Sequence, residues 1–329
     1  MNINIIKCHG TGNDFVLIDE LTNDYNISED DREKMAVVLC DRKGLIGADG
    51  ILFVQKSLKY DAKMRIFNLD GSEAEMCGNG LRCVGRYVME LLNMDKINVE
   101  TMKANYIVQK AENIFKDIQT VEIEINTVDF DINSLPMKGS SSQFIFSKID
   151  ELSEKLEFTG VSITNPHVVT IVDEFNSDTI LDIGRRANTL KSIFPSGVNV
   201  NFVKILDENS IYVKTYERGV GLTKSCGTGM TAASIVTCLK DEARYNSEIN
   251  VYNDGGMIKC VVEKNSEEEY KVRFIGNASL IYRTSIDMQS ILNNEITSVS
   301  KELFDNEIAE YDEFLSYVGS ITNKQTMKL

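Results

Sequence analysis

Two stretches of this chain read Met76-Cys77-Gly78-Asn79-Gly80 and Ser225-Cys226-Gly227-Thr228-Gly229. Each leads directly into a segment whose apolar residues recur at helical spacing, over residues 79–94 in the first case and 228–240 in the second. A motif that recurs with the same kind of element behind it is typical of two related domains. We therefore expect two such domains, each with a helix that begins at a cysteine.

The position of these cysteines favours acid–base chemistry. A thiol at a helix amino terminus lies beside unpaired backbone N–H groups and the positive end of the helix dipole, and both lower its pKa. The same N–H groups bind a carboxylate, and flanking glycines let it approach closely. Two such sites suit a reaction that needs one thiolate and one thiol on opposite faces of a single carbon. The alternative is a pair of buried cysteines that begin helices by coincidence.

Inversion at the α-carbon of an amino acid is a reaction of this kind. The α-proton is a very weak acid, so the enolate-like transition state requires concentrated positive potential at the carboxylate. Two convergent helix termini supply that potential without a metal or pyridoxal phosphate. A thiolate would remove the proton and the opposite thiol would return one. The motifs thus predict a cofactor-independent amino-acid epimerase or racemase with Cys77 and Cys226 as its bases.

The composition is that of a soluble protein with an acidic surface. The chain has 329 residues, of which 43% are hydrophobic and 26% charged, and its formal net charge is −15. This length suits two domains. The negative charge, without any basic stripe, argues against a nucleic-acid partner. The sequence shows neither an apolar run long enough for a bilayer nor a signal-peptide pattern, so we expect a cytoplasmic protein without membrane partners.

The seven cysteines and two histidines predict reduced thiols and no metal site. An odd cysteine count with irregular spacing does not fit a disulfide framework. There is no Cys-x-x-Cys pair, and two histidines are too few for the usual zinc spacings. The cysteines outside the two motifs lie within predicted strands and helices and are expected to be inert: Cys8, Cys40, Cys83, Cys238 and Cys260.

Short apolar runs bounded by Gly, Asn or Asp predict strands along most of the chain. In the first third they alternate with helical patterns, including one over 29–41, so the predicted class is α/β. Strands are predicted at 4–6, 15–19, 50–55, 63–68, 96–101, 106–109, 120–125, 168–172, 198–204, 211–216, 249–252, 257–262 and 270–275.

The pattern weakens over residues 128–160, where the chain contains Gly139-Ser140-Ser141-Ser142. Small and polar residues of this kind are typical of a connection, so we predict the crossing between domains there. The first domain is expected over 1–127, with 275–284 returning to it, and the second over 128–274.

A different pattern follows over residues 285–329. Apolar residues recur there at helical spacing among many Asp and Glu, which predicts one or two acidic amphipathic helices. We expect this C-terminal extension to pack on the core or to form a dimer contact, and a regulatory tail is the alternative.

The order of several further motifs resembles the diaminopimelate epimerase family, over about residues 3–284. Each string alone is short, but their joint presence in this order is specific. Besides the two cysteine motifs they are Lys7-Cys8-His9-Gly10-Thr11-Gly12-Asn13-Asp14-Phe15, Gly47-Ala48-Asp49-Gly50, Arg65-Ile66-Phe67-Asn68-Leu69-Asp70-Gly71-Ser72-Glu73, Asn165-Pro166-His167, Phe194-Pro195-Ser196-Gly197-Val198-Asn199 and Glu217-Arg218-Gly219. The resemblance implies two pseudo-symmetric α/β domains, each a curved mixed β-sheet wrapped around a central helix, with the active site in the cleft between them.

The resemblance also implies roles for individual residues. Cys77 and Cys226 would be the bases, with His167 and Glu217 close to the thiols, where they orient the amino group or tune proton transfer. The reacting carboxylate would be held by Gly78, Asn79, Gly227 and Thr228. The rest of the pocket, which would grip the distal amino-acid end, would be lined by Asn13, Asn68, Asn165, Asn199 and Arg218. A guanidinium suits a distal carboxylate because it can bind it through two hydrogen bonds.

For several residues a structural role is the alternative. Asn13 and Asn68 adjoin glycine-rich turns and could simply stabilise them. Arg218 could pair with a surface carboxylate, and His9 is expected to be structural. The family pattern usually has Glu where this chain has Leu222, and the loss of that carboxylate near the second thiol could change how the thiol is tuned.

The same resemblance implies a substrate. The retained polar set favours an amino acid with a second polar head, hence conversion of LL-diaminopimelate to meso-diaminopimelate, a step of lysine and peptidoglycan-precursor synthesis, by a homodimer without a cofactor. Epimerisation of lanthionine, or racemisation of another amino acid such as histidine, stays open. Alternatives of another class are a thiol redox protein that uses the two cysteines and a non-catalytic amino-acid-binding protein that keeps the same cleft.

Overall fold

The structure is a computed structural model that describes residues 1–139, 141–265 and 269–326. The chain divides into two compact units, the first made of 1–123 with 275–316 and the second of 124–274 with the residues from 317 onward. The domain limits drawn from the sequence, including the extension over 285–329, stay predictions. Ser140 of the predicted crossing and residues 327–329 of the extension lie outside the described residues.

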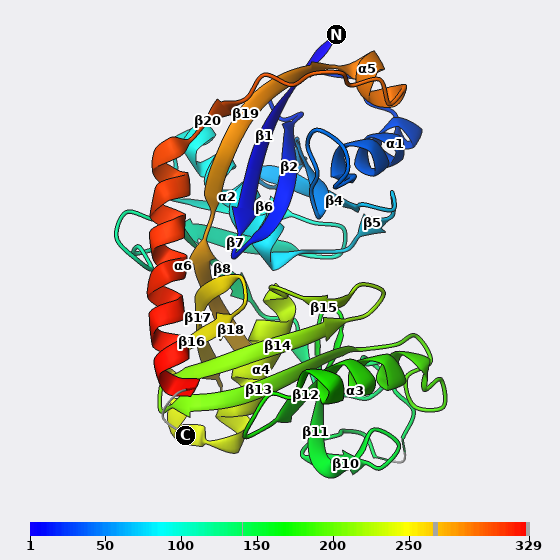
Figure 1. Cartoon of the computed structure of the whole chain (residues 1–329), viewed down its shortest axis with the longest axis vertical. Coiled ribbons are helices and arrows are strands. Elements are labelled where there is room, and N and C mark those ends of the chain that lie inside the picture. The colour runs from blue at the N-terminus through cyan, green and yellow to red at the C-terminus, as the bar shows by residue number, and fades with distance from the viewer. Residues whose placement is uncertain (140, 266–268, 327–329) are drawn as a thin grey trace. The chain divides into compact units, whose positions relative to one another are not determined.

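The first unit is built on a mixed sheet (Figure 1). Neighbouring strands are antiparallel except for two parallel pairs, β2 with β3 and β4 with β6. In order of pairing the strands are β19 (Ser279–Asp287), β1 (Asn2–Gly10), β2 (Asn13–Asp19), β3 (Gly50–Gln55), β4 (Ala62–Asn68), β6 (Lys96–Glu100), β7 (Asn105–Lys110) and β8 (Thr120–Ile125), and β5 (Glu73–Ala74) pairs with β4.

One helix covers each face of this sheet. Successive residues of a strand point to opposite faces, so neighbouring residues contact different helices. Val16 joins a buried cluster with helix α1 (Glu29–Cys40), whereas its neighbour Phe15 lies against helix α2 (Gly78–Leu92). Ser28 begins α1 by accepting a hydrogen bond from the backbone N–H of Asp31. Helix α2 is buried over most of its length and is the central helix of this unit.

The second unit repeats the design with its own mixed sheet. Strands β12 and β13 are parallel, as are β14 and β16, and the other neighbours are antiparallel. The strands are β9 (Val128–Asp129), β11 (Ser153–Ile163), β12 (Pro166–Ile171), β13 (Asn199–Asp207), β14 (Ser210–Glu217), β15 (Gly221–Thr223), β16 (Glu248–Asn253) and β17 (Gly256–Lys264), with β10 (Ser147–Ile149) beside β11. This part of the chain also contains a 3₁₀ turn (Glu242–Arg244) and, directly before β19, strand β18 (Tyr270–Asn277).

Helices again lie on both faces of this sheet. Val200 and Phe202 of β13 pack in a cluster with α3 (Ser177–Thr189), whereas the intervening Asn201 lies against Gly229 in the first turn of α4 (Gly227–Lys240). Helix α4 is buried along nearly its whole length, as a central helix must be.

The predicted α/β class, with a mixed sheet around a central helix in each of two units, is confirmed. The repeated motif also has the same local geometry. Cys77 is the N-cap of α2 with φ −142° and ψ 116°, and Cys226 is the N-cap of α4 with φ −120° and ψ 109°. Each predicted strand has a counterpart, and most are extended by one to several residues at their ends.

The sequence reading predicted no element at α3, β11 or β19. Helix α3 carries Gly184 in its interior, and a glycine there lowers helix propensity by about 1 kcal/mol relative to alanine. The glycine is required by packing, because a Cβ atom at this position would lie 2.2 Å from Cγ of Tyr216. Tertiary contact thus stabilises a helix that its local sequence does not indicate.

The C-terminal residues form α5 (Met288–Leu292), β20 (Glu302–Leu303) and α6 (Asp305–Thr326), so the predicted helices are present. Ile291 of α5 and Phe314 of α6 are fully buried. In the described part of the chain, no helix combines the length and the apolar character needed to cross a membrane.

Candidate active site

Cys77 begins the central helix of the first unit. Its side chain makes no capping hydrogen bond, so the backbone N–H groups in the first turn of α2, which begins at Gly78, lack the usual side-chain acceptor. These donors and the positive end of the helix dipole lie beside the thiol, which is the arrangement that the sequence predicts.

An amide oxygen faces the thiol of Cys77. Oδ1 of Asn13 lies 3.7 Å from its Sγ and accepts a hydrogen bond from Nδ2 of Asn79 at 3.2 Å. Nδ2 of Asn13 donates to Oδ2 of Asp49 at 2.6 Å, and because a carboxylate only accepts, this contact fixes the orientation of the amide. Asp49 in turn pairs with Arg42. This series of hydrogen bonds and ion pairs therefore holds Oδ1 of Asn13, an acceptor, against the thiol of Cys77.

The turn that carries Asn13 is held by the same helix. Thr11 and Gly12 both have left-handed backbones, with φ of 54° and 75°, and this conformation is unfavourable for threonine. The backbone N–H of Thr11 donates to Oδ1 of Asn277 at 2.8 Å, and its hydroxyl accepts from the buried Arg82 of α2 at 2.8 Å. Helix α2 thus positions both the thiol and the turn opposite it.

Asn68 has a different environment. Its Nδ2 donates to the hydroxyl of Ser72 at 3.1 Å, and its backbone N–H donates to the carbonyl of Ser72 at 2.8 Å. These bonds close the turn through Gly71, whose φ is 85°. The turn-stabilising role is therefore present, and a role of Asn68 in substrate binding stays a prediction.

Cys226 begins the central helix of the second unit and is 8% exposed. Burial raises the pKa of its thiol well above the usual value, and the negative charge of Glu217 raises it further. The hydroxyl of Thr228, 3.6 Å from Sγ, and the backbone N–H of Gly229 both lower the pKa. The predicted effect of the helix terminus is present, but burial and Glu217 outweigh it, so Cys226 is a neutral thiol at pH 7.

Glu217 is held by the hairpin that follows it. Strand β15 folds back on β14, and the hydroxyl of Thr223 donates to Oε1 of Glu217 at 3.2 Å. Leu222, where the family pattern usually has Glu, is 44% exposed on this hairpin. The carboxylate beside Cys226 is therefore that of Glu217, and the departure at Leu222 does not remove it.

His167 is fully buried. Its Nε2 lies 2.8 Å from Oδ1 of Asn165, and its Nδ1 lies 3.1 Å from Nδ2 of Asn201. Burial and, to a smaller extent, the positive charge of Arg218 together lower the pKa of His167 to about 3, so the ring is neutral at pH 7. Asn201 was not singled out in the sequence, although it stands two positions after Asn199 and so shares its side of the strand.

Arg218 and Asn199 are joined through the backbone. Oδ1 of Asn199 accepts from the backbone N–H of Arg218 at 2.8 Å, and the guanidinium donates to the carbonyl of Ser196 at 3.3 Å. Gly197 has a left-handed backbone, with φ 74°, and a Cβ atom at this position would lie 3.2 Å from Cγ and Cδ of Arg218. The absence of a side chain at Gly197 therefore leaves room for the arginine. Across the residues described, no carboxylate forms an ion pair with Arg218, so the alternative of a surface ion pair is not supported.

The structure thus brings together three sets of predicted residues, one in the first unit and two in the second. They are Asn13 with Cys77, Gly78 and Asn79; Cys226 with Glu217, Gly227 and Thr228; and His167 with Asn165, beside Asn199 and Arg218. In the ranges that the structure describes, no group of three or more His, Cys, Asp or Glu is arranged to hold a metal.

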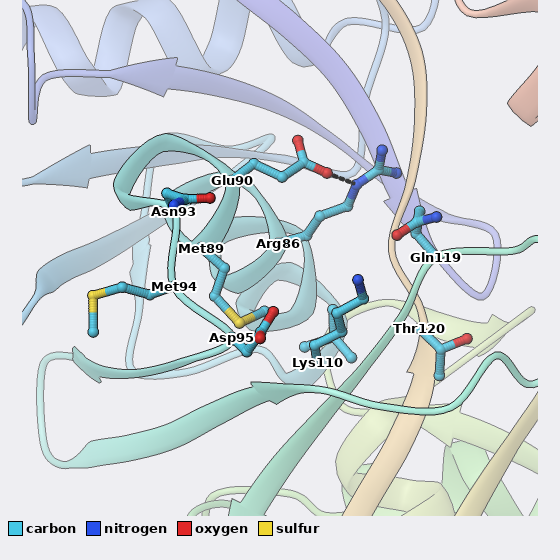
Figure 2. Close-up of a pocket in the computed structure, with 10 residues that line it drawn as sticks. Arg86, Met89, Glu90, Asn93, Met94, Asp95, Lys110, Gln119 and Thr120 are labelled. Carbon is cyan, nitrogen blue, oxygen red and sulfur yellow. Dashed lines mark hydrogen bonds and ion pairs between the residues drawn. The ribbon is translucent and has the colours of Figure 1, made fainter.

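A pocket of about 360 Å³ lies at the far end of α2 from Cys77 (Figure 2). It is lined by residues from the carboxyl end of α2 and from the segments around Lys110 and Thr120, and Arg86 contacts Glu90 at its edge. None of the residues predicted for the active site lines it.

The sequence is similar to a known protein family and to several of its members. The diaminopimelate epimerase family profile matches residues 5–116 and 159–281. A diaminopimelate epimerase from Clostridium acetobutylicum is 52% identical over 317 residues, which are 96% of this chain and 95% of the relative. One from Listeria welshimeri is 42% identical over 96% of this chain and 99% of its own, and one from Lactiplantibacillus plantarum is 38% identical over 96% and 98%.

Solved structures share the fold at low sequence identity. A Bacillus anthracis phenazine biosynthesis protein of the PhzF family superposes with a TM-score of 0.63 at 16% identity, covering 87% of this chain and 99% of its own. A probable proline racemase from Agrobacterium radiobacter gives a TM-score of 0.58 at 14% identity, over 88% and 94%. These likenesses show the fold alone.

Proposed function

Because this chain belongs to the diaminopimelate epimerase family, we propose that it inverts one α-carbon of diaminopimelate, with Cys77 and Cys226 as the two bases. The chain is an isomerase of the epimerase class, and the near-complete coverage of its relatives favours diaminopimelate over lanthionine or histidine. The redox and binding-protein alternatives are not favoured. The reaction places the chain in lysine synthesis.

One observation carries the assignment of the thiols. Both cysteines begin the central helix of their unit with the same backbone conformation, and each lies beside a side-chain oxygen that is itself held by a hydrogen bond, that of Asn13 at Cys77 and that of Glu217 at Cys226. In a two-base inversion, one sulfur removes the α-proton as a thiolate while the other delivers a proton to the opposite face. The reverse reaction exchanges the two roles.

Cys226 is suited to the acid role in this state of the protein. Its pKa lies well above the usual value, because it is buried and Glu217 is beside it, so it carries its proton at pH 7. When Cys226 has given its proton to the carbanion, the nearby Thr228 hydroxyl and Gly229 N–H stabilise the thiolate. Cys77 would then be the thiolate at the start of the same turnover.

The substrate carboxylate at the reacting carbon is assigned to the helix termini. The first-turn N–H groups at Gly78 and Asn79, and at Gly227 and Thr228, are oriented donors that need no reorganisation as charge develops. Oδ1 of Asn79 is buried and has no hydrogen-bond partner among the residues described. An ammonium hydrogen of the substrate would satisfy this acceptor.

Binding of the distal end of the substrate is assigned to the predicted site residues that do not contact its reacting end. The guanidinium of Arg218 is without a carboxylate partner in the described residues, and it can bind the distal carboxylate through two hydrogen bonds. The other members would line the pocket beside it: Asn13, Asn68, Asn165 and Asn199. His167 is assigned to the support of Asn165, and Glu217 to the tuning of Cys226.

Three further properties are part of the proposal. We place the protein in the cytoplasm, as a homodimer that works without a cofactor. The reduced state is required, since oxidation that joined the two thiols would remove both bases. All seven cysteines are free in the structure.

Proton NMR of the reduced protein in heavy water tests the function directly. LL-Diaminopimelate should lose its α-proton signal and yield the meso isomer, whereas L-histidine should keep its signal. Exchange with histidine alone would replace the substrate assignment with that of a racemase, and no exchange with either would remove the enzymatic assignment.

Matched variants test the two thiols. Cys77→Ala and Cys226→Ala should each abolish inversion, because each removes one of two obligatory bases. Cys83→Ala and Cys238→Ala replace buried cysteines further along the same helices and should retain it. Full inversion by either motif variant would refute the two-thiol mechanism.

A further inference from the structure

A buried polar network extends from His167 through Asn201 to Thr215. The exposed fractions of these side chains are 0%, 0% and 4%. Asn201 stands opposite Thr215 in the antiparallel pair of β13 with β14, and opposite Val169 in the parallel pair of β12 with β13. The period of two along a strand therefore places all three side chains on the sheet face that α4 covers.

The orientation of the Asn201 amide is determined by its neighbours. One side of the amide lies 3.3 Å from the backbone carbonyl of Val168, which can only accept, so this side must be the NH₂ group. The opposite side accepts from the hydroxyl of Thr215 at 2.9 Å. The remaining N–H of Asn201 then points at Nδ1 of His167, 3.1 Å away.

This orientation determines the tautomer of His167. Because Nδ1 accepts a hydrogen bond, the single proton of the neutral ring is on Nε2. Nε2 therefore donates to Asn165, which must turn its oxygen toward the ring at 2.8 Å. The NH₂ group of Asn165, a partly exposed residue, is left facing away from the histidine.

We propose that Asn201 is a positioning residue that holds His167 in the Nε2–H tautomer, so that Asn165 presents its NH₂ group to a carboxylate of the substrate. This inference rests on the proposed function, since it concerns the same site. An amide that presents two donors discriminates in favour of a carboxylate and against an ammonium group, so the network would fix which end of the amino-acid head binds there.

The network is also packed against the helix of the second thiol. A Cβ atom at Gly229 would lie 2.4 Å from Oδ1 of Asn201 and 2.9 Å from the hydroxyl of Thr215. The first turn of α4 therefore sits directly on the network. Any rotation of the Asn201 amide requires space that this contact does not leave.

Nitrogen NMR of histidine rings tests the inference without any variant. The chain has only two histidines, so ¹⁵N-histidine labelling gives two ring systems, and His9→Gln assigns them. We expect His167 to show a protonated Nε2, an unprotonated Nδ1 and no titration between about pH 5 and 9. A protonated Nδ1 in the resting protein would overturn the inference.

Two substitutions test the role of Asn201 itself. In Asn201→Asp the carboxylate can only accept, so the ring proton should appear on Nδ1 and Asn165 should lose its fixed orientation. We expect the KM for diaminopimelate to rise by about tenfold or more, with kcat changed much less, since a charge-assisted hydrogen bond is lost. Thr215→Val removes the hydrogen bond to Oδ1 of Asn201 but leaves the carbonyl of Val168 in place, so the ring proton should stay on Nε2 while the ring signals shift by less than in Asn201→Asp.

The control is Thr170→Val. Thr170 is a fully buried threonine on the strand of His167, and its hydroxyl has no hydrogen-bond partner among the described residues. This variant should leave the ring signals and the KM unchanged. Unaltered ring signals in both Asn201→Asp and Thr215→Val would also overturn the inference. If the wild-type protein shows the expected tautomer but no α-proton exchange, the proposed function fails and the tautomer assignment stands.

Discussion

Oδ2 of Asp49 accepts a hydrogen bond from Nδ2 of Asn13 at 2.6 Å, and this contact turns the other end of the amide toward Cys77. In the second unit, the carbonyl of Val168 orients Asn201 in the same manner. In both units an acceptor that cannot donate sets the direction of an amide, and the amide sets the environment of a neighbouring residue of the proposed site, Cys77 in the first unit and His167 in the second.

Asp49→Asn should therefore reduce activity. The Asn13 amide is then free to rotate and to place its NH₂ group against Cys77 instead of its oxygen, at a cost of about tenfold in kcat/KM. The steady-state rate with LL-diaminopimelate checks this. Asp41→Asn is the control, because Asp41 is an exposed residue whose carboxylate accepts a hydrogen bond from the backbone N–H of Lys43 in its own turn. Equal rates for the two variants would argue against the role of Asp49.

Glu217→Gln should lower the pKa of Cys226, because removal of a negative charge beside the thiol favours the thiolate. The pH dependence of alkylation by a small electrophile, in a Cys77→Ala background, should move to lower pH. Inversion by the Glu217→Gln chain with both thiols should fall by about a hundredfold or more, as expected when proton transfer loses its partner.

Glu208→Gln provides the comparison for that experiment, since Glu208 is exposed in the turn between β13 and β14. Its alkylation profile should match that of the parent. A Glu217 variant whose profile also matches the parent would show that Glu217 does not tune the thiol.

The unfolding free energy should fall as the pH is lowered below 6.5. Burial lowers the pKa of His9 to about 4, whereas the ordinary value is 6.5. The neutral ring is favoured in the folded state, so this contribution is complete above pH 6.5 and is lost as the pH falls to about 4. The loss is on the order of 3 kcal/mol. Urea unfolding at pH 7 and pH 4.5 should show a smaller difference in His9→Gln than in the parent chain.

Helix α6 should contribute to stability through one deeply buried side chain. Phe314 is fully buried, and its neighbour Leu315 is 37% exposed. Glu307 on the same helix accepts from Arg86 of α2 at 2.6 Å and 2.8 Å. Phe314→Ala should cost about 3–5 kcal/mol of unfolding free energy, as for other buried aromatic residues, and Leu315→Ala much less. Similar losses for the two would mean that α6 is not docked as described.

The sequence was sufficient where one residue type has one physical role. The two cysteine motifs predicted the beginnings of α2 and α4, because each motif stands directly before a run of apolar residues at helical spacing. It was insufficient where a role depends on a neighbour far along the chain. Asp49 lay within a recognised motif without an assigned partner, and Asn201 gains its role only when β12, β13 and β14 are side by side.

The pKa of Cys226 is a second case of this kind. A helix terminus argues for a lowered value, and its two donors do lower it. The magnitude of burial and the position of Glu217 are properties of the folded sheet, and they reverse the net direction.

A final prediction concerns the glycine that allows α2 to be the central helix of the first unit. A Cβ atom at Gly85 would lie 2.3 Å from Cγ1 of Val108 on β7, well inside contact distance. Gly85→Ala should therefore reduce the unfolding free energy by about 1–3 kcal/mol, although alanine is the better helix former. Val108→Ala alone leaves a small cavity and is also destabilising. Combined with Gly85→Ala it should restore part of the loss, because the new methyl group occupies the space that the valine vacates. Additive losses in the double variant, measured by urea unfolding, would show that α2 and β7 are not packed this closely.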